Sequence, residues 1–133
     1  MHSRIYLDSC IAIYLVEEHQ EFGPVIENLL ESQSDAAGLF ISDLTILECM
    51  VSPLRSKNRL LEEKYNGWFE DVTVLNMPKP VFIRAAQLRA KHTSLRTPDA
   101  LHLAAAQHFD CDEFWTNDTR LNNILPSMVK NVV

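Results

Sequence analysis

The sequence predicts an α/β fold, a three-layer α/β/α sandwich around a five-stranded, mainly parallel sheet. Short apolar runs typical of buried strands alternate along the chain with segments of helical periodicity. Strands that alternate with helices are joined by right-handed crossovers, so they pair in parallel and carry helices on both faces. The chain has 133 residues, 47% of them hydrophobic, and no linker or internal repeat. We therefore expect one domain with one core over residues 1–133.

The first strand leads directly into two helices. Residues 5–7 are typical of a short buried strand, with Asp8 at its carboxyl end, and residues 9–16 are expected to be helical. Phe22-Gly23-Pro24 interrupts the pattern. Pro24 suits the first turn of a second helix that continues through Leu30.

The second strand, residues 38–41, is followed by a third helix. Ser42 or Asp43 can cap this helix, and Ser52-Pro53 is expected to interrupt it. Its spacing predicts one apolar face formed by Leu44, Leu47 and Val51.

The next elements continue the alternation of helices and strands. A fourth helix is expected over residues 57–69, a third strand over 72–75 and a fifth helix over 81–92. Strands over residues 113–115 and within 128–133 complete the expected sheet.

A sixth helix is expected to begin at Thr97-Pro98-Asp99. Thr97 is a suitable cap and Pro98 suits the first helical position. Asp99 then faces the positive end of the helix dipole. The helix is rich in alanine, so it can lie close against a sheet.

Charge is unevenly distributed along the chain. The net charge of −6 argues against a nucleic-acid partner. However, residues 5–54 hold nine acids and no Lys or Arg, whereas residues 72–98 hold five bases and no acid. This distribution fits an acidic pocket beside a basic track for phosphates, but charge alone favours two ordinary solvated helix faces. Charge alone leaves the partner open.

The cysteines and the apolar runs indicate the cellular compartment. The chain has an odd number of cysteines, and they are widely spaced and outside any Cys/His metal pattern: Cys10, Cys49 and Cys111. We expect reduced thiols, with Cys10 and Cys49 behaving as small buried hydrophobic groups. No apolar run approaches the roughly 20 residues of a membrane span, and no signal peptide is visible. The expected location is the cytoplasm.

Four carboxylates occupy positions where a site is expected: Asp8, Glu48, Asp99 and Asp118. Asp8 ends the first strand, Asp118 follows the fourth, and Asp99 lies in the first turn of a helix. Ligands of open α/β sheets bind beyond the carboxyl ends of the strands. Glu48 lies on the apolar face of its helix, where a carboxylate is costly unless something pairs with it.

Clustered carboxylates favour a cation. They repel one another unless a cation binds, and oxygen ligands suit Mg²⁺ or Mn²⁺. Such ions activate water and neutralise a phosphodiester, so no side-chain nucleophile is needed, and no Gly-rich phosphate loop is evident. Each acid also has an ordinary role, since Asp8, Asp99 and Asp118 suit helix starts and Glu48 can extend into solvent.

The four acids lie in four motifs. These are Tyr6-Leu7-Asp8-Ser9-Cys10-Ile11, Ser42-Asp43-Leu44-Thr45-Ile46-Leu47-Glu48, Thr97-Pro98-Asp99-Ala100-Leu101-His102-Leu103-Ala104, and Phe114-Trp115-Thr116-Asn117-Asp118 followed by Leu121. In this order and at these separations they resemble the PIN-domain family, particularly the ribonuclease toxins of VapBC-type toxin–antitoxin systems. The resemblance covers essentially the whole chain, and the third motif is the most specific.

The resemblance implies a five-stranded parallel sheet and a metal-dependent endoribonuclease that hydrolyses RNA phosphodiester bonds. It implies that Asp8, Glu48 and Asp99 coordinate Mg²⁺ or Mn²⁺, directly or through water, and that Asp118 completes the acidic cluster. Ser9 and Thr116 are implied to hydrogen-bond to this cluster. A homodimer and an antitoxin that covers the site are implied as well.

Other residues near the motifs have two interpretations each. His102, three residues after Asp99, is a candidate partner of the site or a packed residue. Arg96 is a candidate for steering phosphate or an ordinary exposed side chain.

Three functions other than a nuclease are compatible with an α/β fold of this kind but fit the sequence less well. A catalytically silent module of the same fold could bind RNA or protein, although clustered acids gain little near phosphates. A receiver-like domain requires a phosphate-accepting acid after the third strand, where Asn76 stands, and a second acid beside Asp8, where Ser9 stands. A phosphatase with an Asp nucleophile requires an acid two residues after Asp8, where Cys10 stands.

Overall fold

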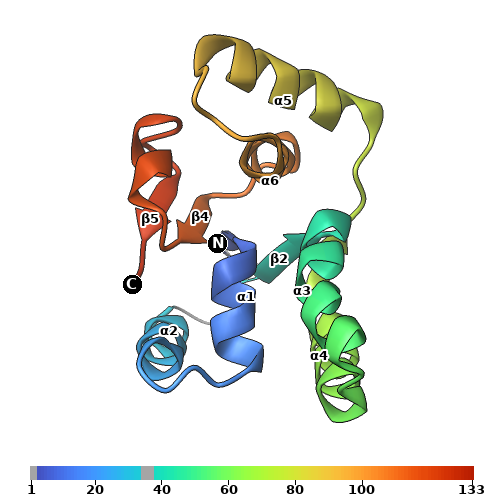
Figure 1. Ribbon diagram of the computed structural model, residues 1–133. Helices are drawn as coiled ribbons and strands as arrows, with labels where there is room; N and C mark the ends of the chain where they lie inside the picture. Colours follow the sequence, from blue (N-terminus) through green and yellow to red (C-terminus); the bar gives the residue numbers. More distant parts are fainter. Residues whose placement is uncertain (1–2, 34–37) are drawn as a thin grey trace.

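A computed structural model describes residues 3–33 and 38–133. Its sheet has the order β3-β2-β1-β4-β5, and all four neighbouring pairs are parallel. Helices lie on both sides of this sheet (Figure 1), which confirms the predicted α/β architecture. The strands are β1 (Arg4–Leu7), β2 (Gly38–Ser42), β3 (Thr73–Leu75), β4 (Glu113–Thr116) and β5 (Val129–Asn131). The helices are α1 (Ser9–Val16), α2 (Phe22–Glu31), α3 (Asp43–Ser56), α4 (Arg59–Asp71), α5 (Lys79–Lys91), α6 (Thr97–His108) and the 3₁₀ helix η1 (Thr119–Asn123).

Strand β1 is buried on both faces. Tyr6 packs with Phe114 in the cluster that includes residues of α5 and α6, whereas Ile5 and Leu7 pack in the cluster that includes residues of α1 and α2. Successive side chains of a strand point to opposite faces, so the apolar run of β1 serves both layers. Burial on both faces is typical of a central parallel strand.

The layer of α5 and α6 depends on small side chains. Ala100, Ala104, Ala105 and Ala106 of α6 are all fully buried. Helix α6 contacts β4, and α5 lies against α6 (Figure 1). The alanines therefore let α6 approach the sheet closely, as the sequence predicted. No helix within the described ranges is both long and apolar enough to cross a membrane.

The strand order reverses between β1 and β4. The chain goes from β1 to β2 and β3 on one side, then returns to β4 and β5 on the other. The carboxyl ends of the two strands meet at this point, where the Asp8 amide donates to the Trp115 carbonyl at 2.9 Å. A reversal of this kind is where α/β sheets place their ligands.

Helix α3 differs from its prediction in two respects. It passes through Pro53, where one amide donor is missing, and ends within a turn of it at Ser56. Its buried residues are Thr45, Cys49 and Pro53. The predicted apolar face is wrong, since Leu47 is 61% exposed and Val51 is 40% exposed.

The start of α6 also differs from its prediction. Thr97 is the first residue of the helix, Pro98 is the second, and Arg96 occupies the cap position. The Thr97 hydroxyl instead accepts a hydrogen bond from Arg89 Nη1 at 2.9 Å. The expected cap of α3, Ser42, is confirmed, and Pro24 lies in the first turn of α2 as predicted. The predicted break at Phe22-Gly23 is wrong, because α2 already begins at Phe22.

Candidate active site

Asp8 lies between β1 and α1, and two hydrogen bonds fix its carboxylate. Oδ1 accepts from the Ser9 amide at 2.8 Å, and Oδ2 accepts from Thr116 Oγ1 at 2.7 Å. The first bond caps α1, and the second crosses the reversal point to β4. Asp8 therefore has its ordinary structural role and also a fixed place at the carboxyl edge of the sheet.

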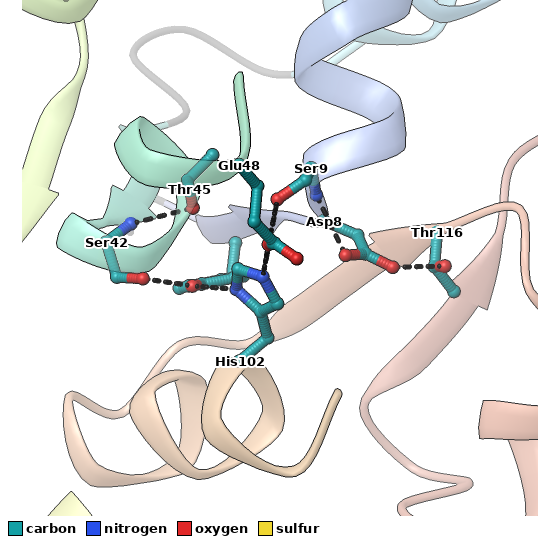
Figure 2. Close-up of polar contacts among 8 residues, drawn as sticks. Asp8, Ser9, Ser42, Thr45, Glu48, His102 and Thr116 are labelled. Carbon is teal, nitrogen blue, oxygen red and sulfur yellow. Dashed lines mark hydrogen bonds and ion pairs between the residues drawn. The ribbon is translucent and has the colours of Figure 1, made fainter. Parts of the chain in front are cut away.

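Thr116 connects Asp8 to the segment that carries Asp118. Its hydroxyl is completely buried, donates to Asp8 and accepts from the Asp118 amide at 3.0 Å. Figure 2 shows the Thr116 side chain pointing from β4 toward the Asp8 carboxylate. Two acids that are 110 residues apart in sequence are thus joined through one hydroxyl.

The Asp118 carboxylate is bound by Arg120. Its Oδ1 accepts from the Arg120 amide and from Arg120 Nε, each at 2.9 Å, and Oδ2 accepts from Nη2 at 2.6 Å. These hydrogen bonds lower the pKa of Asp118 below its ordinary value, together with the positive charges of Arg120 and Arg96. Asp118 caps η1, as its ordinary interpretation predicted, and its carboxylate is engaged by a guanidinium.

Glu48 projects from α3 between α1 and α6 (Figure 2). Its Oε1 accepts from Ser9 Oγ at 2.7 Å and from His102 Nε2 at 2.5 Å. Burial raises the pKa of Glu48, but these hydrogen bonds and the charge of His102 outweigh burial, so the net pKa lies below its ordinary value. The carboxylate on the inner side of α3 is paired, as the physical argument required.

Asp99 lies half-buried in the first turn of α6. Burial raises its pKa above the ordinary value, and the negative charges of Asp8 and Asp118 raise it further. The charges of His102 and Arg96 only partly oppose this effect. Asp99 is therefore the acid at this edge whose charge is least well compensated.

His102 is the residue that sequence reasoning underestimated. It is 1% exposed and contacts Glu48 through Nε2 and the Tyr6 hydroxyl through Nδ1, the latter at 2.6 Å. The Tyr6 hydroxyl in turn lies 2.8 Å from Ser42 Oγ at the start of α3. The available signal was the spacing of three residues from Asp99, which places both side chains on one face of a helix.

The sequence pattern of the PIN domain matches residues 5–124. The chain belongs to the PIN domain family. The matched range includes all four candidate acids, Ser9, Thr116 and His102. No curated protein matches the chain in sequence.

Several solved structures share the fold of this PIN domain. A toxin–antitoxin complex from Klebsiella pneumoniae has 24% identity and a TM-score of 0.78, covering 97% of this chain and 98% of its own. VapBC-1 from nontypeable Haemophilus influenzae has 14% identity and a TM-score of 0.80, with the same coverage. VapC20 from Mycobacterium tuberculosis, a sarcin-ricin loop cleaving toxin, has 14% identity and a TM-score of 0.71, covering 90% of this chain and 93% of its own. At these identities the similarity establishes the fold.

The acids of this PIN domain suit a divalent cation in their chemistry. Carboxylate oxygens are the ligands that Mg²⁺ and Mn²⁺ prefer, and the repulsion that raises the pKa of Asp99 is what a bound cation would relieve. Across residues 3–33 and 38–133, no three His, Cys, Asp or Glu side chains are close enough to form a ready metal site. The Asp118 carboxylate is bound to Arg120 instead.

A small hollow lies beside Asp99 in this PIN domain. Its volume is about 120 Å³, and its lining includes Arg96, Asp99 and Arg120 together with Leu95 and Leu121. Two arginines thus stand next to the acids, on the side of η1 and the start of α6. A larger hollow of about 620 Å³ between the end of α3 and α4 contains none of the four acids.

Proposed function

We propose that this PIN domain is a metal-dependent endoribonuclease and the toxin of a toxin–antitoxin pair, with an active site formed by Asp8, Glu48, Asp99 and Asp118. The observation that carries the proposal is that Ser9 and Thr116 connect three of the acids by hydrogen bonds. Ser9 joins Asp8 to Glu48, and Thr116 joins Asp8 to Asp118. The carboxylates of Asp8 and Glu48 and the backbone of Asp118 are therefore connected at the carboxyl edge of the sheet, where a cation would be bound.

The similar proteins support the biological part of the proposal. Two of them are toxin–antitoxin complexes, and a third is described as a sarcin-ricin loop cleaving toxin. By analogy, the protein partner of this chain would be a small antitoxin, and its substrate would be an RNA. The homodimer and the cytoplasmic location expected from the sequence belong to the same proposal.

Mg²⁺ or Mn²⁺ would be held by Asp8, Glu48 and Asp99, and Asp118 would join them once Arg120 releases it. The chemistry supplied by such a cation is a water of lowered pKa and positive charge beside the phosphodiester. Because the fixed carboxylates of Asp8 and Glu48 already accept hydrogen bonds, each has little freedom to rotate away from the site.

The chain itself contributes binding and charge. Arg96 and Arg120 line the hollow beside Asp99 and are complementary to RNA phosphates. Hydrolysis adds water to the phosphorus, breaks the bond to the leaving ribose oxygen and gives that oxygen a proton. The products are two RNA ends, one of them carrying the phosphate. No side-chain nucleophile is required.

The decisive experiment is cleavage of total cellular RNA by the purified protein with Mn²⁺, with Mg²⁺ and with EDTA. Asp8→Asn removes one charge at the site, and Asp71→Asn is the matched control at the exposed end of α4. We expect discrete fragments with metal for the parent and the control, and intact RNA for Asp8→Asn and for EDTA.

The other results separate the alternatives. Equal cleavage by Asp8→Asn, or cleavage in EDTA, would refute the proposed site and indicate a contaminating nuclease. Tight Mn²⁺ binding that Asp8→Asn abolishes, without cleavage of any RNA, would favour the catalytically silent module. No Mn²⁺ binding by the parent protein would refute the metal site itself.

A further inference from the structure

His102 is the only ionisable side chain among the buried residues of α6, and the others are alanine or leucine. The buried residues of α6 are Ala100, His102, Leu103, Ala104, Ala105 and Ala106. A buried imidazole costs free energy unless both ring nitrogens find partners, and an aliphatic side chain would fill this place without that requirement. The partners of His102 therefore indicate why an imidazole stands here.

Both ring nitrogens have partners, and they come from different elements. Nε2 lies 2.5 Å from Glu48 Oε1 of α3, and Nδ1 lies 2.6 Å from the Tyr6 hydroxyl of β1. Ser9 Oγ lies 3.3 Å from Nε2 and donates to the same Glu48 oxygen. Figure 2 shows the ring between α6 below and the Glu48 side chain above.

The direction of the hydrogen bond to Glu48 follows from the chemistry of the partners. An ionised carboxylate only accepts, so Nε2 carries the proton and donates it to Glu48. The Tyr6 hydroxyl has a single proton. If it donates this proton to Nδ1, the imidazole is neutral; if it donates to Ser42 Oγ, Nδ1 also carries a proton and donates to the Tyr6 oxygen. In both arrangements Tyr6 holds the far side of the ring and Nε2–H faces Glu48.

The Tyr6 side chain is itself rigidly placed. It is completely buried, and its ring stacks on Phe114 with centroids 5.3 Å apart and planes 7° from parallel. The central strand of the sheet thus fixes Tyr6, Tyr6 fixes the imidazole, and the imidazole fixes the carboxylate.

These contacts use only one of the two carboxylate oxygens of Glu48. Oε1 accepts two hydrogen bonds, whereas no hydrogen bond to Oε2 is present among the described residues. The Glu48 side chain keeps 30% of its surface exposed. Without His102 its flexible stem could turn toward solvent.

We propose that His102 is a positioning residue that, held by Tyr6, fixes Glu48 through Oε1 and leaves Oε2 for a divalent cation. This inference rests on the proposed function, and it assigns to α6 two tasks at one site. Asp99 supplies a ligand from the first turn, and one turn later His102 orients a ligand of another helix. Outer partners of this kind typically change metal affinity 10- to 100-fold when removed.

The test measures Mn²⁺ affinity by isothermal titration calorimetry, without RNA, for four proteins. They are the parent, His102→Leu, His102→Gln and the control His108→Leu, which changes an exposed histidine at the end of the same helix. We expect His102→Leu to weaken Mn²⁺ binding about tenfold. We expect His102→Gln to restore most of the affinity, because its amide can donate to Glu48, and His108→Leu to match the parent.

A second measurement does not depend on metal or on a variant at position 102. In the parent protein, a ¹⁵N-edited NMR spectrum should show a slowly exchanging His102 Nε2–H proton. Glu48→Gln should shift that resonance. An Nε2–H that exchanges freely, or is indifferent to Glu48→Gln, would overturn the inference.

The outcomes separate this inference from the proposed function. If the parent binds Mn²⁺ and His102→Leu binds it equally well while remaining folded, His102 is a packing residue and the nuclease proposal stands. If the parent and Asp8→Asn bind Mn²⁺ with the same weak affinity, the proposed metal site is refuted, and the role of His102 with it.

Discussion

Replacing Thr116 with valine removes one hydroxyl and nearly preserves the shape of the side chain. That hydroxyl is completely buried, donates to Asp8 Oδ2 at 2.7 Å and accepts from the Asp118 amide at 3.0 Å. A hydrogen bond to a charged group contributes about 1.5–3 kcal/mol, and an amide left without its partner adds to the loss. We expect a total cost of about 3 kcal/mol, which for a domain of this size lowers the melting temperature by roughly 10 °C.

The assay is thermal unfolding by circular dichroism in EDTA, so that metal binding does not contribute. Thr116→Ser keeps the hydroxyl and loses only a buried methyl group, worth about 1 kcal/mol. Thr119→Val, at an exposed position of η1, is the control and should unfold like the parent. A Thr116→Val protein that melts within about 2 °C of the parent would refute the hydrogen-bonded link between the two acids.

Three further predictions concern the charges and thiols around the site. Because the folded-state pKa of Asp99 is raised above the ordinary value of 3.8, its ionised form destabilises the metal-free fold as pH rises above that value. Asp99→Asn should therefore raise the melting temperature in EDTA at pH 7 and lose this advantage at pH 3.5; equal melting curves at pH 7 would contradict the raised pKa. Arg120→Gln should free the Asp118 carboxylate, so calorimetry should find Mn²⁺ binding strengthened on the order of twofold, with little change in melting temperature; weaker binding would show that Arg120 helps to form the site. Burial raises the pKa of Cys10 and Cys49 to about 12, so mass spectrometry should find both unmodified after brief native iodoacetamide treatment at pH 8 and modified after unfolding; rapid native labelling of Cys10 would contradict this.

Local chemistry predicted the framework of the fold. Pro24 marks the first turn of α2, Ser42 marks the start of α3, and the apolar run before Asp8 marks β1. These features depend only on the backbone preferences and the hydrophobicity of a few neighbouring residues. The positions of Asp8 and Thr116 at strand ends followed from the same reasoning, and with parallel pairing they had to meet at one edge.

The buried face of α3 could be predicted only with information from distant segments of the chain. Its leucines suggested the buried face, but the inner side of the helix carries Thr45, which accepts from the Ser42 amide at 3.1 Å, and Glu48. Polar partners from β2 and α6 therefore decide which face turns inward. Hydrophobic spacing could not predict this, because it scores these polar side chains as outward-facing.

The role of His102 was hidden for a related reason. Its partner Tyr6 lies 96 residues away in sequence, and its partner Glu48 lies 54 residues away. No local pattern distinguishes an imidazole with such partners from one that only fills space. The pairing of Asp118 with Arg120 is short-range, yet it depends on the turn into η1 rather than on the charges alone.

The parallel direction of all five strands has a practical consequence for handling the protein. Arg4 begins β1 at the edge opposite the acids, whereas Asn131 ends β5 at the edge that carries them. An affinity tag fused before β1 would emerge away from Asp8, but one fused after Val133 would emerge on the same side as Thr116, which pairs with Asn131 in the sheet. A histidine tag in the second location would compete for the metal under study, so purification should use the first.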